Sequence, residues 1–147
     1  MNRHRPTQTN AQVRLFSAPW MKSGWPSLGI ATVKASLQDA GISVAASHFH
    51  LETAARLGWN NYEVLSETWG AGEALFGALI DPDDAPRLQF FAAQALRAAG
   101  HDSLADWANG PATEELQMLF DKWIDDNAAL SAPIVGASVG ALQLCGS

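Results

Sequence analysis

The stretch that decides the fold is residues 13–49, VRLFSAPWMKSGWPSLGIATVKASLQDAGISVAASHF. The apolar run at 13–18 predicts a short strand, because it is brief and is followed at once by a turn-forming segment. A helix is expected over 28–40, with Gly41 as its C-cap. Small and β-branched residues predict a second strand over 42–49. A strand, a helix and a strand within about 40 residues form a βαβ crossover, which favours a parallel sheet.

The rest of the chain consists of a long helical region followed by one more strand. Nearly every residue of the range 51–130 has helical periodicity or loop character. The expected helices cover 50–57, 62–79, 86–99, 101–108 and 113–129. Residues 133–138 predict a third, buried strand, and residues 139–144 predict the start of another helix.

The fold class expected from this order is α/β, a partial Rossmann-like parallel sheet with a helical insertion, about 51–130, between the second and third strands. A doubly wound sheet normally has five or six strands, and three are visible here. We therefore expect a truncated domain over 13–147. It is preceded by a polar leader, residues 1–12, that we expect to be disordered.

Composition excludes several classes of partner. The chain has 147 residues, of which 48% are hydrophobic, and this suits one domain with a real core. A net charge of -6 argues against nucleic acids and anionic membranes, because both need a basic face. Neither a signal peptide nor a spanning segment is visible, and there is one cysteine, so we expect a cytoplasmic protein. Nothing in the sequence indicates the oligomeric state.

The loop after the first strand is the first candidate site, because ligands of open α/β sheets lie at the carboxyl ends of the strands. It offers two indoles to a flat ligand and the amides of a helix N-terminus to a polar group. The candidate residues of this loop are Pro19, Trp20, Met21, Pro26 and Ser27. The alternative is a capped loop whose indoles complete the core.

The segment after the third strand, GASVG at 136–140, is the second candidate, with Ser138 and Val139 as its site residues. It matches G-x-S-x-G, the nucleophile elbow of α/β-hydrolases, in the required strand–turn–helix context. In that fold the histidine and the acid follow the serine, whereas all four histidines of this chain precede it. A serine hydrolase fragment stays an alternative, a serine in a binding loop is favoured, and no catalytic residue is predicted.

Other polar residues are weaker candidates for a functional site. His48 and His50 could form a metal site with Glu52, but a further clear ligand is missing and no metal is predicted. Glu73 is interpreted as a solvated helix position, as are Asp125 and Asp126. The dinucleotide motif G-x-G-x-x-G is absent, which excludes a nicotinamide site of that type.

A family resemblance rests on five segments in order. They are APW at 18–20, PSLGIATVKASLQDAG at 26–41, HLETAARLGWNNYE at 50–63, GEALFGALI at 72–80 and PIVGASVGALQL at 133–144. Together they resemble the N-terminal region of cobalamin-dependent radical SAM proteins, and most of all the C-methyltransferases that mature ribosomally made peptides. The likeness covers the chain from residue 13 to its end and is loosest over 81–130.

The resemblance implies a Rossmann-like cobalamin-binding domain, with the corrin over the strand ends and the two candidate loops beneath it. The signature D-x-H-x-x-G is absent, so the resemblance implies a base-off cobalamin without a histidine ligand. The expected partners are the corrin and, through the parent protein, a peptide substrate that becomes methylated.

Activity in that family also needs S-adenosylmethionine and an iron–sulfur cluster held by C-x-x-x-C-x-x-C. This chain contains only Cys145, so we expect no turnover from these residues alone and place both groups in a missing C-terminal part of the parent protein. A third interpretation is a non-catalytic module that docks a partner through its Trp-rich helices.

Overall fold

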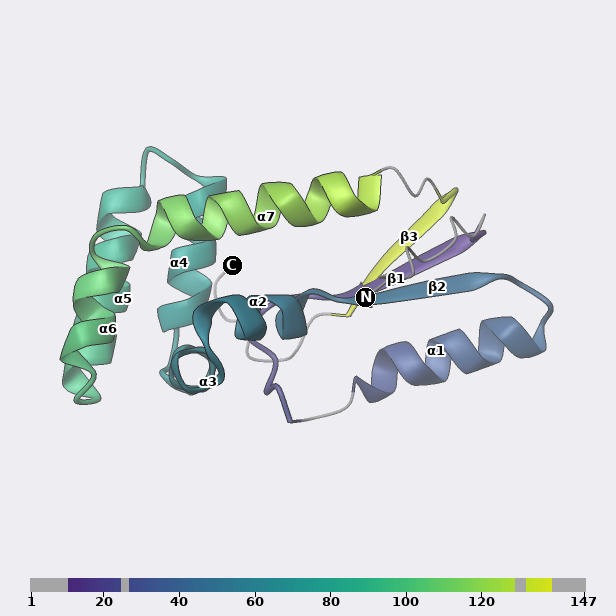
Figure 1. The fold of residues 1–147 in the computed structure, drawn as a ribbon, viewed down its shortest axis with the longest axis horizontal. Coiled ribbons are helices and arrows are strands. Elements are labelled where there is room, and N and C mark those ends of the chain that lie inside the picture. Colours follow the sequence, from purple (N-terminus) through teal and green to yellow (C-terminus); the bar gives the residue numbers. More distant parts are fainter. Residues whose placement is uncertain (1–10, 25–26, 129–131, 139–147) are drawn as a thin grey trace, which may run out of the picture.

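The computed structural model describes residues 11–24, 27–128 and 132–138. These residues form an α/β structure with a three-stranded parallel sheet and seven helices (Figure 1). The strands are β1 (Val13–Ser17), β2 (Val44–His48) and β3 (Ile134–Ser138). Their order in the sheet is β2-β1-β3, and both pairs are parallel. The predicted α/β class and parallel sheet are therefore confirmed.

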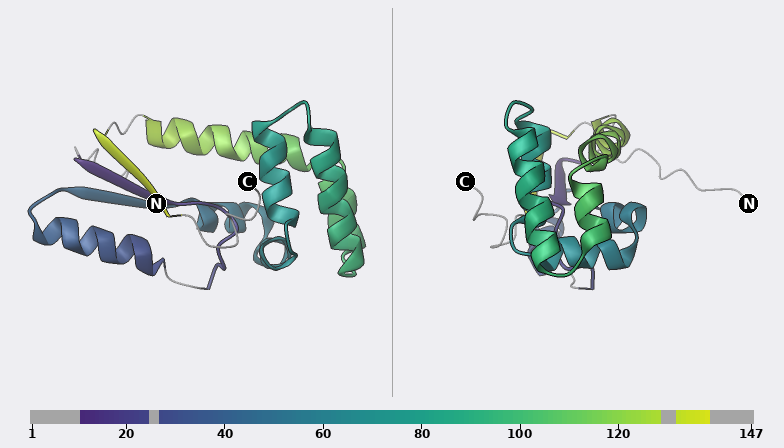
Figure 2. Two further views of the ribbon diagram at one scale, coloured as in Figure 1. Left: turned by 180° about the vertical axis from the view of Figure 1, so that it is seen from behind. Right: turned by 90° about the vertical axis from the view of Figure 1, so that its left-hand side faces the viewer.

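One helix follows β1, and six lie between β2 and β3 in the chain. Their bounds are α1 (Leu28–Asp39), α2 (Phe49–Leu57), α3 (Trp59–Glu67), α4 (Ala71–Ile80), α5 (Ala85–Ala98), α6 (Asp102–Ala108) and α7 (Ala112–Ala128). Figure 2 shows α4, α5 and α6 side by side, away from the sheet.

The single helix predicted over 62–79 is wrong, because two helices, α3 and α4, occupy this range. The chain turns at Thr68–Gly70, where Gly70 has a φ of 72°. Glycine enters this left-handed region without the Cβ clash that other residues meet. Apolar periodicity continues across the turn, which is why the two helices resemble one in the sequence.

Two predicted segments lie mainly outside the described residues. The helix start expected at 139–144 is wholly outside them, and so is the leader except for Ala11 and Gln12. Those two residues are held by the sheet: Ala11 is buried, and Gln12 donates from its backbone N–H to the carbonyl oxygen of Ser43 at 3.0 Å.

The sheet is covered on both faces by different helices. Val13 and Leu15 of β1 pack with Ile30 of α1 in a small apolar cluster on one face. On the other face, Phe16 meets Trp123 of α7, with ring centroids 5.3 Å apart. Alternation of side chains along β1 explains this division, and Figure 1 shows α1 and α7 on opposite sides of the sheet.

A larger apolar cluster lies within the helical region. Tyr62, Leu65, Leu75 and Leu96 are its fully buried large side chains, with Leu116 nearly so. Alanines fill much of the space between α4, α5, α6 and α7, and small side chains let helix axes approach closely. The helical region therefore has a core of its own, beside the sheet.

Candidate functional site

The carboxyl ends of the three strands meet at one edge of the sheet. Ser17, the last residue of β1, is the register partner of His48 on one side and of Ser138 on the other. The chain places β2 on one side of β1 and β3 on the opposite side, so the strand order reverses between β1 and β3. Crevices at such reversals are where open α/β sheets bind ligands.

A buried serine–histidine pair lies beneath this edge. Ser17 Oγ and His50 Nδ1 are 2.5 Å apart, and the two residues are 0% and 2% exposed. Burial lowers the pKa of His50, and the neighbouring His48 lowers it further, so the neutral imidazole is favoured. Since Ser17 has no exposed surface, this pair joins β1 to α2 and does not present a nucleophile.

A cavity of about 460 Å³ opens between α1 and the end of β2, and we call it the α1 cavity. Its lining residues are Ser23, Gly24, Ser27, Ile30, Ala31, Lys34, Ala46, His48, His50 and Leu51. Two enclosed polar atoms of this lining, Ser27 Oγ and His48 Nδ1, have no hydrogen-bond partner among the described residues. Buried polar atoms are normally paired, so this cavity has unmet hydrogen-bonding capacity.

The loop after β1 is held in place by α3. Tyr62 donates its hydroxyl to the carbonyl oxygen of Met21 at 2.6 Å. The backbone N–H of Ser23 donates to Glu63 Oε1 at 3.1 Å, and Lys22 Nζ lies 2.8 Å from a carboxylate oxygen of Glu67. Burial also raises the pKa of Tyr62, which keeps this hydroxyl a donor. The helical region thus positions the first candidate loop.

Trp20 lies in the core and not on the surface of this loop. It is 5% exposed, its φ is 69°, and its ring stacks on Tyr62 with centroids 5.6 Å apart. A Cβ at Gly72 would lie 2.6 Å from the indole, so the glycine makes room for it. Trp20 therefore agrees with the alternative interpretation of this loop, in which its indoles complete the core. The second indole of the loop, at position 25, lies outside the described residues.

The remaining predicted site residues divide into three groups. Pro19 is buried directly after β1, and Met21 is half-buried. Ser27 lines the α1 cavity, and Ser138 ends β3 beside Ser17. Pro26 and Val139 lie outside the described residues. The structure therefore brings Ser17, the last residue of β1, next to Ser138, as parallel pairing requires.

Sequence reasoning missed the pairing of Ser17 with His50. The one available signal was a serine at the end of an apolar strand, where a buried hydroxyl requires a partner. His50 and His48 lie close, with ring centroids 5.6 Å apart, whereas the charges that act on Glu52 are those of Asp126 and Lys122 on α7. Among the described residues no group of three or more potential ligands could hold a metal ion.

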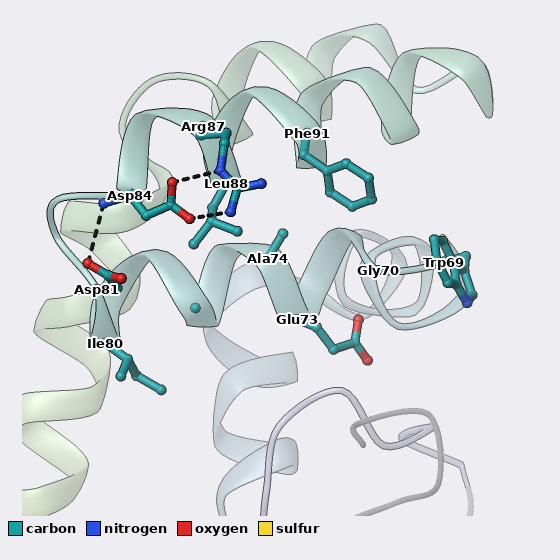
Figure 3. A pocket seen from close by; sticks show the side chains of 11 residues that line it. Trp69, Gly70, Glu73, Ala74, Ile80, Asp81, Asp84, Arg87, Leu88 and Phe91 are labelled. Atoms are coloured by element: carbon teal, nitrogen blue, oxygen red, sulfur yellow. Dashed lines mark hydrogen bonds and ion pairs between the residues drawn. The ribbon is translucent and has the colours of Figure 1, made fainter. Parts of the chain in front are cut away.

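A second cavity of about 540 Å³ lies between α4 and α5, and Figure 3 shows it from close by. Trp69, Leu88 and Phe91 contribute apolar surface to it. Glu73 is half-buried there and points away from the Asp84–Arg87 ion pair. The prediction that Glu73 is a solvated position is wrong, since burial raises the pKa of its carboxyl.

Neither a family model, nor a curated protein, nor a solved structure matches this chain. Within the described ranges, no helix has both the length and the apolar character needed to cross a membrane. What bears on function is therefore the geometry of the strand ends, taken together with the resemblance of the sequence segments.

Proposed function

We propose that this chain is the cobalamin-binding part of a radical SAM enzyme that methylates a ribosomally made peptide. The observation that carries the proposal is the adjacency of β1 and β3, whose last residues, Ser17 and Ser138, are register partners where the strand order reverses. Open α/β sheets bind their ligands at such a reversal, where loops converge above the ends of the parallel strands. The resemblance of five sequence segments supplies the identity of the ligand.

The strand order favours a flat cofactor over a dinucleotide. In the dinucleotide-binding order 3-2-1-4-5-6, the third strand lies beside the second. Here β3 lies beside β1, as in the order 2-1-3-4-5, where the flat flavin mononucleotide binds between the first and third strands. The absence of the motif G-x-G-x-x-G agrees with this choice.

The exposed surface of β3 supports a larger sheet in the parent protein. Ile134 and Val135 are 60% and 63% exposed on the outer strand of the sheet. Unprotected apolar edge strands pair with other chains, and natural proteins usually cover them. We infer that further strands continue the sheet beyond β3, and that α2 to α7 form an insertion in a Rossmann-like domain.

The residues at the strand ends fit a flat ligand in part. The loop from 18 to 27 contains no histidine, so its residues would hold the corrin through contacts other than a histidine ligand. Pro19 and Met21 are the described residues of this loop that we assign to corrin contacts, together with the backbone position of Ser138 at the end of β3. Trp20 supports the loop from within the core, and Ser27 lines the α1 cavity instead. When bound, methylcobalamin supplies the methyl group. This chain's own part is to hold the corrin at the sheet edge.

Spectroscopic titration tests the proposal. The chain and its parent protein are titrated with hydroxocobalamin, and binding is followed by the change in the visible spectrum and by the stoichiometry. We expect one corrin per chain in the parent protein, with a base-off spectrum. A parent protein that binds no corrin would refute the proposal.

A pair of variants locates the site. Ser138→Phe adds bulk at the end of β3 and should weaken corrin binding at least about tenfold, the loss of about 1.4 kcal/mol of binding energy. Ser103→Phe places the same bulk on an exposed position of α6 and should leave binding unchanged. Equal binding by both variants would place the corrin elsewhere.

A further inference from the structure

We propose that the α1 cavity is a binding site for the phosphate group of a small molecule. It lies on the face of the sheet that α1 covers, beside the end of β2. The proposal does not depend on the corrin, because it rests on the chemistry of this cavity alone.

The first observation is an unpartnered serine at the start of a helix. Ser27 is the N-cap residue of α1, and its side chain makes no capping hydrogen bond. It is 8% exposed, lines the cavity, and its Oγ has no hydrogen-bond partner among the described residues. An N-cap serine normally accepts a hydrogen bond from a first-turn amide. Here the hydroxyl makes no such bond and has no other hydrogen-bond partner among the described residues.

The second observation is the electrostatic field at the N-terminus of α1. α1 is 12 residues long, and no acidic residue occupies its first turn. The carbonyl oxygen of Ser27 accepts from Ala31, which is the first bond of the helix. The amides before Ala31 have no acceptor within the helix, and with the helix dipole they favour an anion.

The third observation is the charge of the lining. Lys34 lines the cavity, and no ion pair of Lys34 is found among the described residues. His48 Nδ1 is enclosed and has no hydrogen-bond partner among the described residues, so it is available to a ligand. The described lining contains no carboxylate; Glu63, beyond it, accepts from both the backbone N–H and the hydroxyl of Ser23. The cavity is thus locally basic in a chain of net charge -6.

The size of the cavity indicates an organic phosphate. A volume of about 460 Å³ exceeds what a phosphate ion needs and falls in the range of small-molecule sites. Ile30, Ala46 and Leu51 give one part of the lining an apolar character. A phosphate monoester with a small apolar body therefore fits the polar end and the apolar part together.

Calorimetric titration of the full chain tests this proposal, with inorganic phosphate and phenyl phosphate as probes at constant ionic strength. We expect saturable binding at one site. Ser27→Ala and Lys34→Gln should each weaken it about five- to tenfold, because each removes one charge-assisted contact. Ser36→Ala is the matched control on α1, since Ser36 is exposed and, among the described residues, its hydroxyl bonds to the carbonyl oxygen of Thr32 within the same helix.

The outcomes separate the possible sources of the phosphate and the two proposals. Tighter binding of phenyl phosphate than of phosphate supports an organic ester, and equal binding supports free phosphate as the ligand of the same site. Absence of saturable binding for both probes overturns the proposal, and so does binding that neither variant weakens. If Ser27→Ala does not fold, the weakening of phosphate binding by Lys34→Gln alone tests the proposal. Phosphate binding by a parent protein that binds no corrin would support this site and contradict the proposed function.

Discussion

The helical region and the sheet of this protein differ in what they bury. Among the described residues, the apolar cluster of the helical region contains fourteen buried residues, whereas the cluster between α1 and the sheet contains three. Ser17 and His50 form a buried polar pair at the strand ends, and Ser27 is buried at the start of α1 without a hydrogen-bond partner for its Oγ. Thr53, buried on α2, donates its hydroxyl to the carbonyl oxygen of Phe49. Apolar burial is the main source of stability and unpaired polar burial opposes it. Stability therefore comes chiefly from the helices, whereas the positions that we propose for binding lie at the sheet edge and beside α1.

A few contacts join the helical region to the sheet and hold the loop after β1 in place. Trp20, which follows β1 closely, is buried among the helices, and Tyr62 bonds to the loop beside it. Phe16 of β1 packs on Trp123 of α7, with ring centroids 5.3 Å apart. A stable helical region can thus hold a sheet edge whose polar groups are not fully satisfied.

The largest expected effect is the difference between two leucine truncations. Leu75→Ala removes a fully buried side chain from the helical cluster, and we expect a loss of about 4 kcal/mol in the free energy of unfolding. Leu15→Ala in the small sheet cluster should cost about 2 kcal/mol, because fewer buried neighbours surround the space it leaves. Urea denaturation measures both. An equal or larger cost for Leu15→Ala would contradict the comparison.

A smaller effect is expected at the contact between the regions. Gly72→Ala places a Cβ 2.6 Å from the Trp20 ring and should destabilise the protein by about 1–3 kcal/mol, despite the helix preference for alanine. Gly24→Ala is the control, since a Cβ there meets nothing within 4 Å. Thermal unfolding and tryptophan emission report the change. A stabilising Gly72→Ala would show that Trp20 does not pack against α4.

The smallest effect concerns the pH dependence of the sheet edge. The pKa of His50 is lowered in the folded state from its ordinary value of 6.5, so the unfolded chain binds this proton more readily. Stability should therefore fall as the pH decreases through 6.5 and below. His50→Gln should flatten this part of the profile, and His101→Gln, outside the pair, should not. An unchanged profile in His50→Gln would show that the buried pair does not control it.

Local patterns predicted most of the fold. The strand at 13–18, the helix at 28–40 and the strand at 133–138 all lie within a residue or two of the structure, because short-range periodicity and Gly41 mark them. The break at Gly70 was missed, because the left-handed turn interrupts the backbone without interrupting the apolar pattern.

The candidate site was predicted less completely, because its contacts join distant positions. Ser17 and His50 are 33 residues apart, and neither the pattern of the first strand nor that of α2 indicates that they share a hydrogen bond. The burial of Trp20 depends on Gly72, which no pattern near the loop reveals. Parallel pairing did predict that the ends of the first and third strands lie together, because it follows from topology alone.

Hydrogen exchange with and without methylcobalamin tests the central claim most directly. If the corrin covers the carboxyl ends of β1 and β3, added methylcobalamin should slow amide exchange in residues 15–24 and 134–138. Exchange in α5 and α6, within the helical region, should stay unchanged. Protection confined to those helices, or no protection at the strand ends, would contradict the account.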